Sequence, residues 1–188
     1  DNYSNCHFYA QPRADWDFYY GSSYHPFQRR KLRREVQPRE YQILFEDKEV
    51  CQQLCLGVGL RCPVSPGTLS PHQSISKQIH TMTSGLDSVS LIAKPVSGAS
   101  GQGIFLVSKN GDRIEALTAG SRIDIDNIRI SERVLLQELV VQHPAIAAIY
   151  PDSVNTLRIL TLTTRDGEQL VLSVLMRFGV GAAFIDNW

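Results

Sequence analysis

Leu91-Ile-Ala-Lys94-Pro-Val-Ser-Gly-Ala-Ser-Gly-Gln-Gly-Ile104 is the stretch that decides the fold prediction. Val89 to Val96 alternates and is rich in β-branched residues, which predicts a strand that carries Lys94 near its end. A loop of small residues follows, and Ile104 to Ser108 predicts a second strand. A lysine therefore stands at the entrance to a glycine-rich loop between two strands.

The loop has the composition of a phosphate cradle. Glycines at 98, 101 and 103 allow backbone N–H groups to approach an anion closely, because no Cβ intervenes. The loop also contributes hydroxyl donors, and Lys94 adds a positive charge. We therefore expect a triphosphate to be bound by the residues Lys94, Ser97, Gly98, Ser100, Gly101 and Gly103. The alternative is a plain glycine-rich hairpin beside an exposed lysine, since lone glycine motifs are weak signals.

The order of these features excludes three better-known nucleotide loops. A P-loop ends in Gly-Lys-Ser/Thr before a helix, whereas Gly103 is followed by Ile104 and a strand. A dinucleotide-binding fingerprint also requires a helix after the loop. A protein kinase places its glycine loop before its lysine, and here the lysine comes first.

The rest of the chain predicts an α+β fold with a mainly antiparallel second half. Asn110-Gly111 is a hairpin signal that leads into a strand from Arg113 to Leu117. Asp166-Gly167 is a second hairpin signal. It joins two long expected strands, which span Val154 to Thr164 and Gln169 to Phe178.

Two helices are expected before the glycine loop. Asp47 is a suitable N-cap for a helix from Lys48 to Leu56, with Val50 and Leu54 on its buried side and Gly57 and Gly59 at its end. Pro71 to Thr83 has apolar residues at helical spacing and predicts the second helix.

Composition limits the class of protein. The 188 residues include 19 basic and 19 acidic side chains, so no net charge favours nucleic acid. No apolar run approaches the roughly 20 residues of a membrane span. The basic cluster at residues 29–34 reads as a solvated helix face, with an anion contact as the alternative. The chain starts at Asp1 and stops at Trp188 directly after a strand-like run, so we expect a fragment of a longer protein.

The cysteines predict a reducing environment. Cys6, Cys51, Cys55 and Cys62 lack the paired spacing of a zinc site, so we expect free buried thiols and a cytoplasmic location.

Several segments taken together resemble the ATP-grasp superfamily. These are Ala93-Lys94-Pro95 with its loop, Ser153-Val-Asn-Thr-Leu-Arg158 and the terminal Asp186-Asn187. The chain looks most like the sugar-transfer-associated, or alpha-L-glutamate-ligase-related, subgroup over roughly residues 40 to 188. The resemblance implies an ATP-grasp fold that is incomplete on its C-terminal side. It divides the chain into an N-terminal segment (1–40) and a partial ATP-grasp domain (41–188), with a lysine-and-flap subdomain near 60–135 and the start of a central sheet in 136–188.

The resemblance also implies roles for individual residues. Lys48 and Lys94 look like the two phosphate-contacting lysines, and residues 97–103 look like the flap over the phosphates. Arg158 and Arg177 look like the catalytic cations that face the transferring phosphoryl group. The linker that binds the adenine edge is matched by Gln137, Glu138, Leu139 and Val140.

The reaction implied is a carboxylate–amine ligation with ATP and Mg²⁺, acting on a small carboxylate substrate through an acyl phosphate. A non-catalytic nucleotide-binding module and a phosphotransferase, in a polysaccharide-related pathway, are the alternatives. The family's magnesium ligands include a Glu-x-Asn on late strands. The chain offers no match to it before Trp188, so the metal site is expected beyond that residue.

Overall fold

The computed structural model describes residues 34, 37, 39–98, 101–118 and 121–179. The chain divides into two compact units, Asp1–Phe45 and Glu46–Trp188. The first described elements are a 3₁₀ turn, η2 (Arg39–Tyr41), and the short helix α3 (Ile43–Glu46). The elements of the site belong to the second unit.

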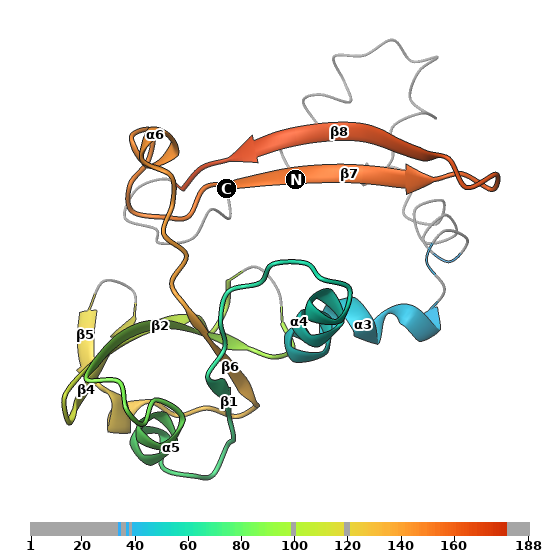
Figure 1. Cartoon of the computed structure of the whole chain (residues 1–188). Helices are drawn as coiled ribbons and strands as arrows, with labels where there is room; N and C mark the ends of the chain where they lie inside the picture. The colour runs from blue at the N-terminus through green and yellow to red at the C-terminus, as the bar shows by residue number, and fades with distance from the viewer. Residues whose placement is uncertain (1–33, 35–36, 38, 99–100, 119–120, 180–188) are drawn as a thin grey trace. The chain divides into compact units, whose positions relative to one another are not determined.

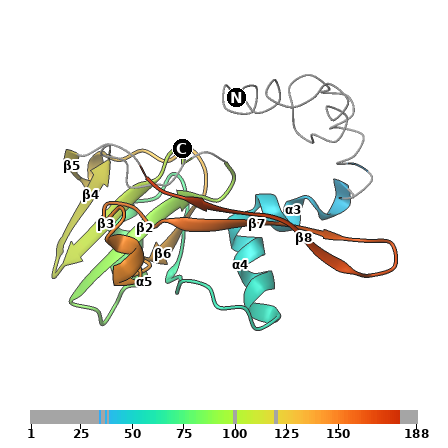
Figure 2. The same ribbon diagram turned by 90° about the horizontal axis from the view of Figure 1, so that it is seen from above.

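A six-stranded antiparallel sheet forms the main layer of the second unit (Figure 1). Its spatial order is β1-β6-β2-β3-β4-β5, so the late strand β6 inserts between β1 and β2. Figure 2 shows β2, β3 and β4 side by side as a curved layer. The strands are β1 (Gly67–Leu69), β2 (Ser88–Pro95), β3 (Phe105–Asn110), β4 (Arg113–Thr118), β5 (Ser121–Asp124) and β6 (Val134–Glu138).

The predicted hairpin around the glycine loop is confirmed. Strands β2 and β3 pair antiparallel, with Ala93 opposite Phe105. The turn at Asn110-Gly111 is also confirmed, because Gly111 has a φ of 59° and β4 follows at once. The predicted α+β character is thus present in this sheet and its helices.

One face of the sheet carries the hydrophobic core. Helix α5 (Ile75–Met82) and the 3₁₀ turn η3 (Ile125–Asn127) cover this face, and α5 packs through Ile75 and Ile79. The strands contribute alternate residues, among them Leu91, Ala93 and Phe105. The second predicted helix is therefore real but begins at Ile75 and not at Pro71, because Ser74 caps it by accepting a bond from the Lys77 N–H.

Helix α4 (Lys48–Gly57) confirms the first predicted helix and its cap. The Asp47 side chain accepts hydrogen bonds from the backbone of Glu49 and Val50. The predicted buried side was wrong, however. Val50 is 38% and Leu54 41% exposed, whereas Gln52 is 7% exposed. The helix turns this polar residue inward because its partners are polar groups on β6 and in the loop at residue 63.

Strands β7 (Thr156–Thr163) and β8 (Gln169–Arg177) form a separate two-stranded sheet (Figure 1). The predicted turn at Asp166-Gly167 is confirmed, since Gly167 has a φ of 83° and the Thr164 N–H donates to the Glu168 carbonyl. Apolar side chains remain exposed on both faces of the hairpin: Leu157, Ile159, Leu160, Leu162, Val171, Leu172, Val174, Leu175 and Met176.

Asn155 organises the loop before this hairpin, beside the short helix α6 (Pro144–Ala147). Its side-chain amide donates to the carbonyls of Ile146 and Tyr150, at 3.3 and 2.9 Å. Its Oδ1 accepts from the Ser153 hydroxyl and from the Gly179 N–H. The Ser-Val-Asn motif therefore joins the loop before β7 to the residue Gly179, which follows β8.

Several predictions fall on residues whose structure is not described: Ser100, Cys6, Asp186-Asn187 and most of the basic cluster. The three described cysteines are free, as predicted, but half-buried and not buried. In the described part of the chain, no helix is both long and apolar enough to cross a bilayer.

Candidate functional site

Lys94 lies on the face of the sheet opposite the core. Ala93 and Pro95 point to the other side, because successive residues of a strand alternate. Lys94 is paired with Leu135 of β6. Gln137 lies two residues after Leu135 and therefore projects from the same face of the sheet. This geometry brings Lys94 and Gln137 together, although 43 residues separate them.

Lys94 is held by a relay of uncharged groups. Its Nζ donates to Oε1 of Gln137 at 3.0 Å. Nε2 of Gln137 donates to Oε1 of Gln52 at 3.0 Å, and Nε2 of Gln52 donates to the Pro63 carbonyl, also at 3.0 Å. The relay joins β2, β6, α4 and the loop after α4.

Lys48 lies at the start of α4 and reaches the same region. Its Nζ donates to the carbonyls of Pro95 at 2.8 Å, Val96 at 3.4 Å and Gly98 at 2.9 Å. Its backbone N–H also donates to the Val96 carbonyl, at 3.1 Å. Lys48 thus binds the first part of the glycine loop through its main-chain carbonyl oxygens.

The two lysines create an uncompensated positive charge. Burial, and next the charge of Lys48, lower the pKa of Lys94 below its ordinary value. Among the described residues, neither lysine forms an ion pair with a carboxylate. A phosphate would supply the missing negative charge, so the arrangement favours an anionic ligand.

The acidic groups nearby are occupied by other partners. Arg133 binds Asp47 at 3.1 Å and Glu49 at 2.8 Å, and so ties the start of α4 to the strand β6. The carbonyl of Arg133 accepts from the Val96 N–H at 2.9 Å. These contacts fix the helix start beside the loop and leave the lysines free of carboxylates.

Glycine is required in the loop by its backbone conformation. Gly98, Gly101 and Gly103 have φ values of 131°, 73° and 70°. A Cβ on Gly103 would lie 2.9 Å from Cγ of Pro95, so the loop packs closely onto the strand end. The Ser97 N–H donates to Oε2 of Glu132 at 3.3 Å, and an incoming anion would have to displace this carboxylate.

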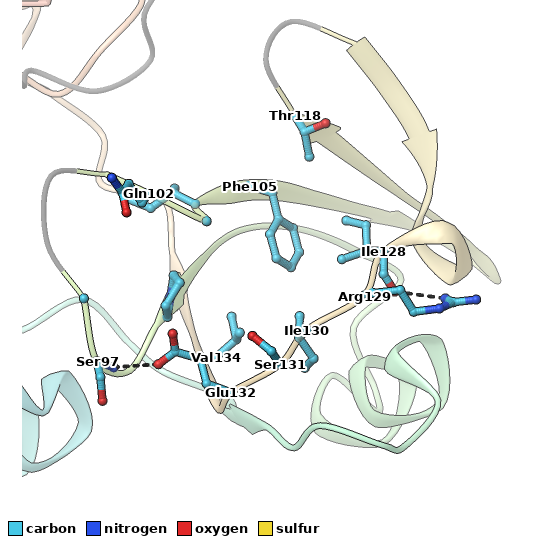
Figure 3. Close-up of a pocket in the computed structure, with 14 residues that line it drawn as sticks. Ser97, Gln102, Phe105, Thr118, Ile128, Arg129, Ile130, Ser131, Glu132 and Val134 are labelled. Carbon is cyan, nitrogen blue, oxygen red and sulfur yellow. Dashed lines mark hydrogen bonds between the residues drawn. The ribbon is translucent and has the colours of Figure 1, made fainter.

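A cavity of about 410 Å³ lies behind the loop (Figure 3). Phe105, Ile130 and Val134 line it from the core side of the sheet, so it does not open onto the face that carries Lys94. Figure 3 also shows Glu132 directed to Ser97 at its edge. The cavity leaves open space behind the loop but contributes no cation to the lysine site.

The predicted adenine linker follows Lys94 on the neighbouring strand. Gln137 is 8% exposed and its side chain is committed to Lys94, while Glu138, Leu139 and Val140 are exposed. The N–H of Glu138 donates to the Val64 carbonyl at 2.8 Å, and that of Leu139 to the Ser90 carbonyl at 3.4 Å. Within the described chain, the Val140 N–H has no such partner and is free for a ligand.

The predicted arginines are not part of this cluster. Arg158 lies opposite Leu175, and Arg177 lies opposite Thr156, both on the separate β7–β8 sheet. Their approach to Lys94 remains a prediction.

No metal centre can be built from the described residues, because no three His, Cys, Asp or Glu side chains gather closely enough. The expected position of the magnesium ligands after Trp188 remains a prediction.

Sequence reasoning missed two contributors to the site. Gln52 gave no signal, because a glutamine in a helix is ordinarily a surface residue. Glu132 lies in an irregular segment, and its bond to Ser97 depends on contact between distant parts of the chain.

Comparison with known protein families matches residues 27–188 to the family model described as sugar-transfer associated ATP-grasp. Searches of the curated proteins and of the solved structures returned no significant match.

Proposed function

This chain belongs to the sugar-transfer associated ATP-grasp family, and on that premise we propose that it acts as an ATP-dependent carboxylate–amine ligase. ATP-grasp domains bind ATP and Mg²⁺, and they are generally ligases or related enzymes. Lys94 and the loop at residues 97–103 would hold the triphosphate. The exposed apolar faces of β7–β8 support the view that this hairpin is part of a larger sheet.

One observation carries the proposal: the pair of lysines that meet only neutral acceptors. The Lys94 amine contacts an amide oxygen, and the Lys48 amine contacts three main-chain carbonyls. Burial and, next, repulsion by the charge of Lys48 both lower the pKa of Lys94. A polyphosphate relieves that repulsion and accepts their hydrogen bonds.

The reaction would take place in two balanced steps. A substrate carboxylate oxygen attacks the γ-phosphorus of ATP, the bond to the β–γ bridging oxygen breaks, and ADP leaves an acyl phosphate behind. An amine then attacks the acyl carbon, the carbon–oxygen bond breaks, and inorganic phosphate leaves as the amide forms and the amine loses a proton. Positioning and charge neutralisation account for most catalysis of phosphoryl transfer.

Each part of the chain has a task in this scheme. Lys94 and Lys48 bind phosphate oxygens, and the free Val140 N–H binds the adenine edge. Arg158 and Arg177 would stabilise the acyl phosphate. The substrate we propose is a small carboxylate, and the words of the family description support a role in a saccharide-related pathway. The free cysteines support a cytoplasmic location.

Isothermal calorimetry with ATP tests the binding step. Lys94→Met should weaken ATP binding at least tenfold, since it removes a charged hydrogen-bond donor. Lys77→Met is the matched control, because Lys77 is an exposed lysine on α5, on the core side of the sheet. Equal ATP affinity in Lys94→Met and the parent would contradict the proposal.

Release of ADP tests the reaction class. A ligase given the carboxylate alone forms at most about one ADP per active site, and it sustains ADP release, matched by amide formation, only when the amine is also present. Turnover without any amine would indicate a phosphotransferase, and binding without turnover would indicate a non-catalytic module.

A further inference from the structure

The hydrogen bonds of the relay from Lys94 to Pro63 all run in the same donor-to-acceptor direction. Each amide accepts through its oxygen and donates through its nitrogen: Lys94 to Gln137, Gln137 to Gln52, and Gln52 to the Pro63 carbonyl. The final acceptor is a main-chain oxygen, which cannot donate. Both amide orientations are therefore determined, and the Gln137 oxygen must face the ammonium group.

Burial makes this orientation costly to change. Gln52 and Gln137 are 7% and 8% exposed, so water does not replace a lost partner easily. Turning the Gln137 amide by 180° would direct its NH₂ group at the Lys94 ammonium and leave a donor without an acceptor. A buried polar group left without a partner is destabilising, so the orientation with the Gln137 oxygen toward Lys94 is strongly preferred.

The relay is also neutral. A carboxylate in place of Gln137 would hold Lys94 equally well but would cancel its charge before a phosphate arrived, and one in place of Gln52 would offset that charge from farther away. Two amides orient the ammonium group and leave its full charge available. Through Gln52, moreover, the relay anchors Lys94 to the same helix that begins with Lys48.

From these contacts we infer that Gln52 is a positioning residue for Lys94, which acts through Gln137 to aim an uncompensated ammonium group at the ligand. The inference rests on the proposed function for its ligand, ATP. Gln52 lies on α4 and contacts Gln137 of β6, so it joins the helix that begins with Lys48 to the strand beside Lys94.

Two readouts test the inference, and one of them needs no nucleotide. The first is the pKa of Lys94, followed by NMR through its side-chain ¹³Cε signal and assigned with Lys94→Arg. The second is ATP affinity by calorimetry. The variants are Gln52→Leu, Gln52→Glu and Gln137→Glu, and Gln78→Leu is the control.

Gln52→Leu removes the acceptor that holds the Gln137 amide. The Gln137 amide then has an unpaired NH₂ group and can leave its orientation, so Lys94 loses its fixed acceptor, the pKa of Lys94 falls further and ATP binds about tenfold more weakly. Gln78→Leu removes a similar amide on α5, which bonds to Ser70, and should change neither quantity.

The two glutamate variants test the role of neutrality. Gln137→Glu places a carboxylate against Lys94, which raises the pKa of Lys94 and weakens ATP binding. Gln52→Glu retains the acceptor for Gln137 and should raise the same pKa less, with ATP affinity closer to the parent than in Gln52→Leu. If Gln52→Leu does not fold, Gln52→Glu provides the pKa test alone.

The outcomes separate the inference from the proposed function. An unchanged pKa of Lys94 in the Gln52 variants would overturn the inference, whatever the ATP result. If the parent chain binds no ATP, the proposed function fails, and the pKa changes still decide whether Gln52 controls Lys94.

Discussion

The Nζ atom of Lys48 lies 2.9 Å from the carbonyl oxygen of Gly98, the first glycine of the loop. Two further carbonyls on the same side of the loop, those of Pro95 and Val96, also accept from this amine. Lys48, which is expected to contact phosphate, therefore binds the main chain of the loop. Binding of a phosphate to Lys48 requires that some of these bonds be exchanged.

Replacing Lys48 should loosen the loop before any ligand is present. Lys48→Met keeps a long, unbranched side chain but loses all three side-chain bonds to carbonyl oxygens. We expect at least tenfold faster amide hydrogen exchange in a peptide covering residues 95–105, measured by mass spectrometry without nucleotide. Lys77→Met on α5 serves as the control. Equal exchange in Lys48→Met and the parent would show that the three bonds do not hold the loop.

The lowered pKa of Lys94 predicts how ATP binding depends on pH. A phosphate favours the protonated amine, so binding raises the pKa of Lys94 from its depressed value in the free chain. ATP affinity should therefore fall as pH rises through that depressed pKa, at lower pH than for an ordinary lysine. Lys94→Arg should lose this decline, because a guanidinium stays charged. Calorimetry across pH 7 to 10 measures the ATP affinity of the parent and of Lys94→Arg. Identical pH profiles for the two would contradict the assignment of Lys94 as a phosphate-binding residue.

Gly103 should tolerate alanine less well than Gly111. Both have positive φ, which costs alanine about 1 kcal/mol in each case. Only at Gly103 would the new Cβ also meet the rigid ring of Pro95, at 2.9 Å, whereas nothing lies within 4 Å at Gly111. We expect Gly103→Ala to lower the free energy of unfolding, measured in urea, by about 1–2 kcal/mol more than Gly111→Ala does. Equal losses would indicate that the loop shifts without strain.

The Asn155 cluster should be sensitive to any group added at Gly179. A Cβ there would lie 2.5 Å from the Ser153 hydroxyl oxygen and 2.5 Å from Cε1 of Tyr150. Gly179→Ala should therefore lower the unfolding free energy by about 2–3 kcal/mol. Gly167→Ala in the β7–β8 turn meets no atom within 4 Å and should cost only the strain of its positive φ. Thermal unfolding of both variants makes the comparison.

Local signals predicted much of the fold because their physics is local. Asp47 caps α4 through its own neighbours, and Asn110-Gly111 forms its turn through the φ that glycine permits. Strands β1 and β5 gave no such signal: they have only 3 and 4 residues, and β1 pairs with the distant strand β6. Short elements of this kind form only where a longer strand offers an edge.

The inward face of α4 shows where local reasoning failed. Apolar periodicity favoured Val50 and Leu54, yet both are exposed, and the buried residue is Gln52. Periodicity assumes an apolar partner, whereas this helix packs on the polar face that carries Lys94 and Gln137. The identity of the opposite surface cannot be read from the helix itself.

The sequence by itself determined that a lysine precedes a glycine-rich loop between two antiparallel strands, because chirality, side-chain volume and strand alternation act within a few residues. Tertiary structure alone decided what surrounds that lysine. Insertion of β6 beside β2 brought Gln137 to Lys94, and packing of α4 brought Gln52 and Lys48. The charge and orientation of a side chain depend on its neighbours in space, and these neighbours come from residues 42 to 46 positions away along the chain.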